Sequence, residues 1–357
     1  MDSTLTIPAH GAMHLPAVTV DAYNAELRDA DGFIGDRASK RAFQSILDDW
    51  RERLADYGDD PLGDDRPTEA FGKRTLEKLL LDGDLDAQGL ILTAIEEFAQ
   101  ELSTVTRRLL RLDGWQNTER IVVGGGFRGS RVGSLAIARA GALLKAAGHA
   151  LDLHLIRHDP DEAGLVGAVH LMPTWMLAGH DTILAVDIGG TNIRAGLVAL
   201  PSVSASFLDD ASVLHSVLWH HRKEEPSRED AVERLTAMLC DLIAQAQQEK
   251  RKLAPFVGIG CPGLIDTDGT IDGGGQNLPG NWEDQEFNLP HRIHSLLPCI
   301  EGHPVSVMMH NDAVVQGLSE VPWMRDVAHW GVLTIGTGLG NARFTNRQAG
   351  GGAAVGG

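Results

Sequence analysis

Two glycine-containing turns, each placed directly after an apolar run, constrain this chain more than any other feature. The first turn, Asp187-Ile188-Gly189-Gly190-Thr191-Asn192, follows the apolar run 183–186. The second, Gly336-Thr337-Gly338, follows the run 332–335. Glycines let backbone N–H groups approach phosphate oxygens, and an aspartate at a strand end can hold the hydrated metal that accompanies a nucleotide. The sequence therefore predicts two phosphate-binding hairpins, with a plain hairpin turn as the alternative for the first.

The pair Asn311-Asp312 lies between these turns and is the main candidate for catalysis. The run 305–310 predicts a strand that ends at this pair, and residues 313–319 predict a short helix. An aspartate that leaves a strand is a candidate general base, and the alternative is a helix N-cap. His310 stands directly before the pair, and its position makes it a candidate for the same site.

Five segments resemble, in order, the phosphate-binding, connecting and sugar-contacting segments of the ROK (repressor, open reading frame, kinase) family of sugar kinases. They are DIGGTNIRAGLV from residue 187, GIGCPGLIDTDGTI from residue 258, QNLPGNW from residue 276, HNDAVVQG from residue 310 and LTIGTGLGN from residue 333. The resemblance covers residues 181–346. It implies an α/β fold of two domains, the actin-like ATPase (ribonuclease H-like) fold, and ATP-dependent phosphoryl transfer to a sugar hydroxyl.

The first half of the chain resembles the rest of the same family in an unusual place. Segments 83–112 and 121–147 resemble the adenosine-binding end of a ROK kinase, and segment 161–168 resembles its final helix. In an ordinary member these segments follow the second phosphate turn, whereas here they precede the first. The resemblance therefore implies a circular permutation, with residues 172–180 joining the old ends and the new ends in a loop after Gly340.

This order implies a particular division into domains. A large domain, with the adenosine site and the second phosphate turn, is expected to comprise residues 20–159 and 310–346. A small domain, with the first phosphate turn and the sugar-side segments, is expected to comprise residues 160–309. Residues 347–357, mostly Gly and Ala, are expected to form a flexible tail.

The resemblance also implies a role for each candidate residue. ATP is held by both turns, with hydroxyl donors from Thr191 and Thr337, and Mg²⁺ lies near Asp187 through water. Adenosine lies against Gly124-Gly125-Gly126. Asp312 accepts the proton of the attacking hydroxyl, and Asn311 and Asn277 hydrogen-bond neighbouring hydroxyls.

Composition narrows the choice of partners. The formal net charge of −18 over 357 residues disfavours nucleic acid. No apolar run is long enough to span a bilayer, so we expect a cytoplasmic protein whose partner is a small sugar or polyol, with a homo-oligomer possible. Cys240, Cys261 and Cys299 lack metal-site spacing, so we expect small buried side chains and no zinc site. Many ROK kinases carry a cysteine-rich zinc loop, and it is absent here.

Two other interpretations stay open. The pattern G-x-G-x-x-G occurs at 258–263, where Pro262 opposes a helix, and at 124–129, where a strand, a turn, a helix and a further strand resemble a dinucleotide-binding unit. An NAD-dependent dehydrogenase is therefore an alternative, although it leaves both phosphate turns and Asn311-Asp312 unexplained. A nucleotide-binding sensor that has lost transfer is the other alternative.

One part of the family's sugar site is missing. ROK kinases bind sugar hydroxyls with a Glu-x-Gly-His segment and a further Glu ahead of an Ala-Ser pair. No Glu-x-Gly-His occurs in this chain, and in segment 32–39 Gly35 occupies the position of the further glutamate. Asp36 either substitutes for it by a shift of one residue or serves as a turn or cap residue.

We predict that the protein is a poor glucose kinase. A sugar hydroxyl that is buried without a partner costs about 1–3 kcal/mol, so two lost contacts lower efficiency by orders of magnitude. Glucose phosphorylation with ATP and Mg²⁺ measures this directly. A kcat/KM of ~10⁴ M⁻¹s⁻¹ or more would show that other residues rebuild the site.

Overall fold

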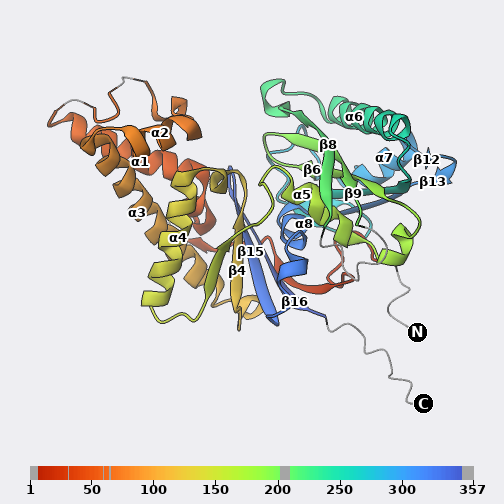
Figure 1. Ribbon diagram of the computed structural model, residues 1–357, viewed down its shortest axis with the longest axis horizontal. Helices are drawn as coiled ribbons and strands as arrows, with labels where there is room; N and C mark the ends of the chain where they lie inside the picture. The colour runs from red at the N-terminus through yellow and green to blue at the C-terminus, as the bar shows by residue number, and fades with distance from the viewer. Residues whose placement is uncertain (1–6, 31, 59, 64–65, 202–209, 348–357) are drawn as a thin grey trace, which may run out of the picture. The chain divides into compact units, whose positions relative to one another are not determined.

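The computed structural model describes residues 7–30, 32–58, 60–63, 66–201 and 210–347. The chain divides into two compact units (Figure 1). The first unit comprises Met1–Asn24, Glu162–His329 and Ala342–Gly357, and the second comprises Ala25–Asp161 and Trp330–Asn341. The tail expected at 347–357 lies outside the described residues except for Arg347. The functional division into adenosine-side and sugar-side domains stays a prediction.

The first unit is built on a five-stranded sheet in the order β8-β7-β6-β9-β14. Its strands are β6 (Thr182–Ile188), β7 (Ile193–Ala199), β8 (Ser212–Trp219), β9 (Leu253–Cys261) and β14 (Ser306–Asn311). Strands β6, β7 and β8 pair antiparallel, whereas β9 and β14 run parallel to β6. The predicted strands at 183–186 and 305–310 are confirmed. Both faces of the sheet are covered, which explains why β6 and β9 are almost continuously apolar.

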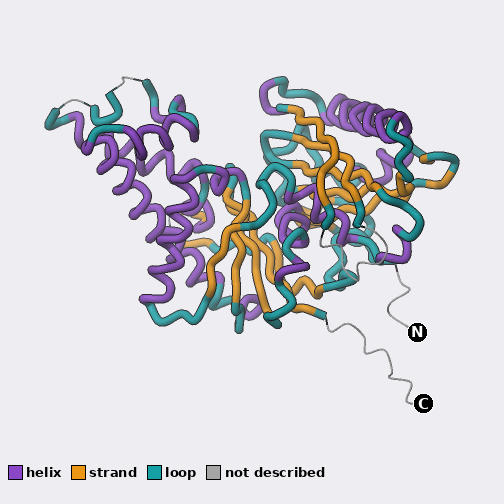
Figure 2. The backbone as a smooth tube through the Cα atoms, viewed as in Figure 1, coloured by secondary structure: helices purple, strands orange, loops and turns teal. Residues whose placement is uncertain are grey.

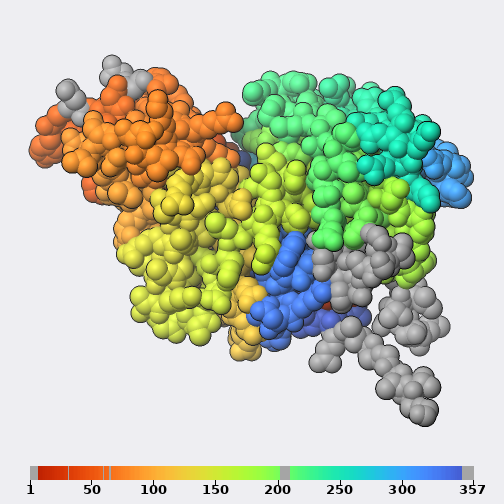
Figure 3. All heavy atoms as spheres, in the orientation of Figure 1, coloured from red at the N-terminus to blue at the C-terminus, as the bar shows by residue number. Residues whose placement is uncertain are grey.

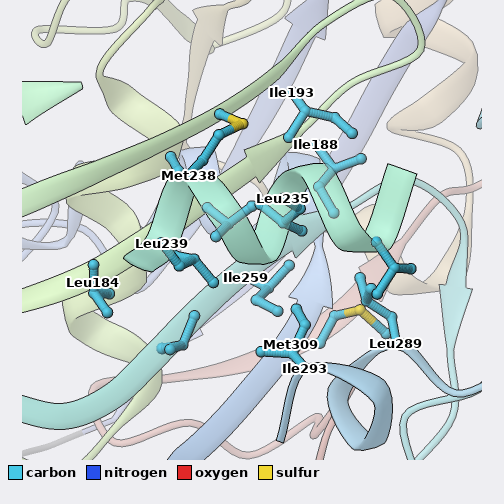
Figure 4. Close-up of a cluster of buried hydrophobic side chains, with 14 of the residues drawn as sticks. Leu184, Ile188, Ile193, Leu235, Met238, Leu239, Ile259, Leu289, Ile293 and Met309 are labelled. Atoms are coloured by element: carbon cyan, nitrogen blue, oxygen red, sulfur yellow. The ribbon is translucent and has the colours of Figure 1, made fainter. Parts of the chain in front are cut away.

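One face of this sheet packs against α6 (Arg228–Gln248) and α7 (Leu289–Leu296). Helix α6 begins at the N-cap Ser227, whose side chain accepts from the Asp230 N–H. Its apolar side chains Leu235, Met238 and Leu239 gather with Ile193 and Ile259 of the sheet (Figure 4). The outer face of α6 lies on the surface in Figure 3. The amphipathic sequence of α6 therefore fixes one side of the core.

The other face packs against α5 (Ala163–Gly167) and α8 (Asp312–Leu318). In β9, Ile259 belongs to the α6 side, whereas a Cβ on the preceding Gly258 would lie 2.8 Å from Ala168, just after α5. A Cβ on Gly167 would lie 1.7 Å from the Val315 carbonyl oxygen. Only glycine therefore allows α5 and α8 to approach this closely, and α8 is the helix that begins with Asp312.

The second unit packs helices against parallel strands (Figure 2). Its helices are α1 (Lys40–Ala55), α2 (Lys73–Asp82), α3 (Leu85–Leu109) and α4 (Arg131–Ala146). Strand β4 (Arg120–Gly124) pairs in parallel with β5 (Asp152–Leu155) and with β15 (His329–Ile335). The rings of Phe43, Phe98 and Phe127 lie 4.8–5.8 Å apart and join α1 and α3 to the segment after β4.

The sheet that contains β15 has the strand order β1-β16-β15-β4-β5. Strand β1 (Val18–Tyr23) pairs antiparallel with β16 (Leu339–Asn346). The loop predicted directly after Gly340 is therefore wrong. The strand continues to Asn346 because Ala342 and Phe344 are fully buried in this pairing.

The remaining strands are two or three residues long and pair as short antiparallel hairpins. They are β2 (Arg28–Asp29) with β3 (Gly32–Phe33), β10 (Leu264–Ile265) with β11 (Ile271–Gly273), and β12 (Cys299–Ile300) with β13 (His303–Pro304). Within the described residues, no helix has both the length and the apolar character that a membrane crossing requires.

Candidate active site

The carboxyl ends of three adjacent parallel strands bring the acidic candidates of the first unit together. Strand β6 ends just after Asp187, β9 ends at Cys261, and β14 ends at Asn311. In the register of the sheet, Gly260 pairs with both Asp187 and His310. Asp312 follows directly at the start of α8. Such an edge is where open α/β sheets commonly bind ligands.

Asn311 and Asp312 divide the possible roles at the start of α8. The Asn311 Oδ1 accepts from the Ala313 N–H at 3.0 Å and from the Val314 N–H at 3.3 Å, and its Nδ2 donates to the Gly263 carbonyl at 3.0 Å. Asn311 is therefore the N-cap. Asp312 is partly buried, and its Oδ1 also accepts from the Ala313 N–H, at 2.9 Å.

Burial and a neighbouring charge shift the acidity of Asp312. Desolvation, and to a smaller extent the negative charge of Asp187, raise the pKa of this carboxyl to about 7, while the hydrogen bond from the backbone N–H of Ala313 acts in the opposite direction. Asp187 pairs across the β6–β7 hairpin with Arg194, whose guanidinium lies 3.7 Å from its carboxylate.

The hairpin turn after Asp187 is held by the residues that follow β8. The Gly189 N–H donates to the Asn192 carbonyl at 2.9 Å, and the buried His221 donates from Nε2 to the Gly189 carbonyl at 2.9 Å. His220 donates from Nδ1 to the Asn192 side-chain oxygen at 2.7 Å. The Arg222 N–H donates to the Thr191 carbonyl at 3.3 Å. These bonds fix a turn whose remaining N–H groups can face an anion.

Asn277 lies beside this turn. A Cβ on Gly190 would lie 2.8 Å from the Asn277 Cβ, so only glycine fits there. Asn277 is exposed and lines a cavity of about 310 Å³, together with His221, Arg222 and Glu225. Asn277 and the turn at 189–192 are therefore neighbours.

The second unit brings the other two glycine segments to one edge of its sheet. Gly124 pairs with Thr334 across β4 and β15, so both strands end side by side. Gly125 has a φ of 80°, and a Cβ there would lie 2.6 Å from the Ile335 backbone. The Gly336 N–H donates to the Gly338 carbonyl at 2.9 Å, and Thr337 lies between them, partly buried. Strand β4, which leads into the run 124–129, is thus flanked by β15 as well as by β5.

Three residues differ from their sequence-based interpretation, and a fourth, Gly35, has little space around it. Cys240 and Cys299 are exposed rather than buried, because each lies on the solvent side of its element, and only Cys261 is buried. His310 is also buried rather than open to a site. Gly35 lies in the 3₁₀ helix Ile34–Ala38, where a Cβ would lie 2.6 Å from the Phe33 ring, so a glutamate does not fit without moving Phe33.

Sequence reasoning missed three residues that shape the acidic site. Arg194 could have been found, because a two-stranded hairpin centred on 189–192 places it opposite Asp187. His221 has no local signal in the sequence, because its bond to Gly189 depends on the fold that places the segment after β8 beside the turn. A Cβ on Gly164 of α5 would lie 2.5 Å from the Asp187 carboxylate carbon, a contact that no local pattern reveals.

The fold and site define an α/β protein with two glycine turns at strand ends and a pair of acidic side chains. The model of the ROK family matches residues 183–357, just under half of the chain, so these residues are similar to the ROK family. The predicted family resemblance is confirmed for these residues, and the sheets and helices of the structure confirm the α/β fold class.

Known proteins overlap with about half of the chain. The glucokinase of Thermotoga maritima (strain ATCC 43589 / DSM 3109 / JCM 10099 / NBRC 100826 / MSB8) is 28% identical over 167 residues, which are 46% of this chain and 44% of the glucokinase. The chain therefore spans less than half the length of this relative.

Two solved structures, both from Cytophaga hutchinsonii ATCC 33406, also overlap with part of the chain. A candidate sugar kinase is 21% identical, with a TM-score of 0.33 over 46% of this chain and 48% of its own. An exopolyphosphatase is 15% identical, with a TM-score of 0.22 over 49% and 51%. At these TM-scores neither overlap carries an argument about this chain.

We predict that Asp312→Asn stabilises the protein near pH 7 and changes its stability little near pH 4. Because the folded-state pKa of Asp312 is raised to about 7, the folded state binds more protons than the unfolded state between about pH 4 and pH 7. Wild-type stability therefore falls as the pH rises through this window. Asparagine does not titrate, and it removes at most about 4 kcal/mol of this penalty, at about 1.4 kcal/mol per pKa unit.

Urea unfolding at several pH values from 4 to 8 measures the effect. Asp272→Asn, which removes an exposed carboxylate from β11, controls for the change in net charge. A difference between Asp312→Asn and wild type that stays constant across this pH range would contradict the raised pKa.

Proposed function

We propose that the protein transfers the γ-phosphoryl group of ATP to a hydroxyl of a sugar or sugar-like polyol. The observation that carries the proposal is the Asp312 carboxyl, partly buried at the end of β14 and within electrostatic reach of Asp187 beside a glycine turn. A carboxyl whose pKa lies near 7 is suited to accept a proton at neutral pH. The family match of residues 183–357 supports the same reaction class.

The chemistry assigns one role to each group. Asp312 takes the proton from the acceptor hydroxyl, the hydroxyl oxygen forms a bond to the γ-phosphorus, and the bond to the β–γ bridging oxygen breaks to release ADP. Asn311 and Asn277 are proposed to hydrogen-bond other hydroxyls of the acceptor. Asn311 is already engaged as a cap, which holds its side chain in one orientation.

The nucleotide is proposed to contact glycine turns in both units. In the first unit these are the N–H groups and the Thr191 hydroxyl of the turn at 189–192. In the second unit they are Gly336, Thr337 and Gly338 for phosphates and Gly124, Gly125 and Gly126 for adenosine. Gly124 and Thr334 are paired neighbours, which supports a common nucleotide role for the two segments.

Asp187 fits a magnesium ion bound through water. Within the described residues, no group of three or more His, Cys, Asp or Glu side chains could enclose a metal ion. Mg²⁺ commonly keeps several waters and binds through one or two carboxylates plus substrate phosphates, and Asp187 offers such a carboxylate. When bound there, Mg²⁺ would neutralise charge on the phosphates.

Sheet topology supports the proposed circular permutation. The sheet of the first unit has the spatial order β8-β7-β6-β9-β14. Numbered by their order in the chain, these are the third, second, first, fourth and fifth strands of the sheet. The other sheet has the same order if β15 and β16 are taken as its first two strands and β1 as its third. The chain ends would then interrupt one repeat of the motif between its second and third strands.

Two substitutions separate acceptor chemistry from nucleotide use. Asp312→Asn keeps the size of the side chain but removes its basicity, so kcat should fall by ~10²–10⁴-fold while the KM for ATP stays near the wild-type value. Asp187→Asn should instead raise the requirement for Mg²⁺ and ATP. Both are measured in a coupled assay with a panel of sugars and polyols, with Asp272→Asn as the matched surface control.

Full turnover by Asp312→Asn would mean that another group is the base. A wild-type protein whose melting temperature rises with ATP but that phosphorylates nothing in the panel would instead support the nucleotide sensor. A melting temperature that rises with NAD but not with ATP would support the dehydrogenase.

A further inference from the structure

A short segment near the N-terminus lies along the free edge of β14. We call residues His10, Gly11 and Ala12 the N-terminal strap. The Gly11 N–H donates to the Met309 carbonyl at 3.0 Å, and the Met309 N–H donates to His10 Nδ1 at 3.1 Å. Because β14 is the last strand of its sheet, the strap occupies an edge that would otherwise lack a partner.

The strap fits this place closely. Gly11 has a φ of 54°, and a Cβ there would lie 1.9 Å from the Ile265 carbonyl oxygen. The His10 ring packs beside Gly269, whose Cβ would lie 3.0 Å from it. Burial lowers the pKa of His10, while the charge of Asp268 acts in the opposite direction. The strap is therefore seated by shape as well as by backbone bonds.

His310 connects the strap to the end of β14. The Asn311 N–H donates to His310 Nδ1 at 2.7 Å, so Nδ1 is an acceptor and carries no proton. Nε2 lies 3.2 Å from the Ala12 carbonyl, which can only accept, so Nε2 carries the proton and donates. The Tyr23 ring meets the imidazole edge to face at 5.2 Å. Both ring nitrogens are therefore hydrogen-bonded, and these bonds hold the imidazole in one tautomer.

We propose that the strap and His310 form a positioning relay that holds Asn311 and Asp312 in place for phosphoryl transfer. The Ala12 carbonyl orients the imidazole, and Nδ1 fixes the backbone of Asn311, the residue that caps α8 and precedes Asp312. His310 is a positioning residue, since it contacts neither acceptor nor nucleotide in this scheme. The effect on rate rests on the proposed function, whereas the effect on the backbone does not.

Two substitutions of His310 separate its two bonds. Asparagine places an amide oxygen where Nδ1 was, so His310→Asn keeps an acceptor for the Asn311 N–H and loses the bond to the strap. Glutamine places its amide nitrogen near the position of Nε2, so His310→Gln keeps the donor to Ala12 and loses the acceptor for Asn311. His310→Gln should lower kcat by about 10²-fold, the scale of a misplaced catalytic group, with the KM for ATP unchanged. The kcat of His310→Asn should be at least tenfold higher than the kcat of His310→Gln.

A substitution in the strap tests the other end of the relay. The added Cβ of Gly11→Ala would clash with the Ile265 carbonyl oxygen, so this substitution should detach the strap from β14. Gly179→Ala is the matched control, because Gly179 also has a positive φ, of 86°, but open space around it. Gly11→Ala should lower kcat in the wild-type background and have little further effect in His310→Asn, where the bond to Ala12 is already lost.

Hydrogen exchange gives a readout that needs no activity. Peptides covering residues 306–318 should exchange faster in Gly11→Ala and His310→Gln than in wild type or Gly179→Ala. Unchanged exchange in this segment would overturn the relay, as would equal loss of rate in His310→Asn and His310→Gln, which indicates that the imidazole only fills volume. Faster exchange in a protein with no kinase activity would keep the relay and reject the proposed function.

Discussion

The electrostatic coupling of Asp187 and Asp312 is the interaction on which the rest of the site depends. Parallel pairing of β6, β9 and β14 ends three strands at one edge and brings two carboxyl groups into mutual reach. Like charges in a desolvated place disfavour double ionisation. Arg194 lies 3.7 Å from the Asp187 carboxylate, so a cation accompanies that carboxyl, and the pKa of about 7 makes Asp312 the candidate proton acceptor near neutral pH.

The surrounding elements keep this unfavourable charge pair in place. Gly164 and Gly167 let α5 pack against Asp187 and α8, and Asn311 caps α8. The edge of β14 is covered by the N-terminal strap, which is hydrogen-bonded to Met309. Backbone contacts of this kind can fix a catalytic side chain without touching the substrate.

Local sequence patterns predicted much of this arrangement. Buried apolar runs followed by Asp187, Asn311 or Gly336 located the strand ends, because the strand and its terminating turn are encoded within about ten residues. Features that need distant partners were not predictable. The end of β16 depends on pairing with β1, and the bond between Ala12 and His310 joins residues 298 positions apart. The exposure of Cys240 likewise depends on which face α6 buries. The roles of Asn277 and of the second-unit glycines remain predictions.

Titration of the Asp312 carboxyl in the wild-type protein tests the central claim most directly. Carbon-13 NMR of labelled aspartate side chains, with the Asp312 signal assigned by its loss in Asp312→Asn, gives the pKa of this group. Our account predicts a value near 7 in the wild type and a lower value in Asp187→Asn, where the neighbouring charge is removed. A value near 4 in both proteins, the ordinary range of an aspartate, would contradict it.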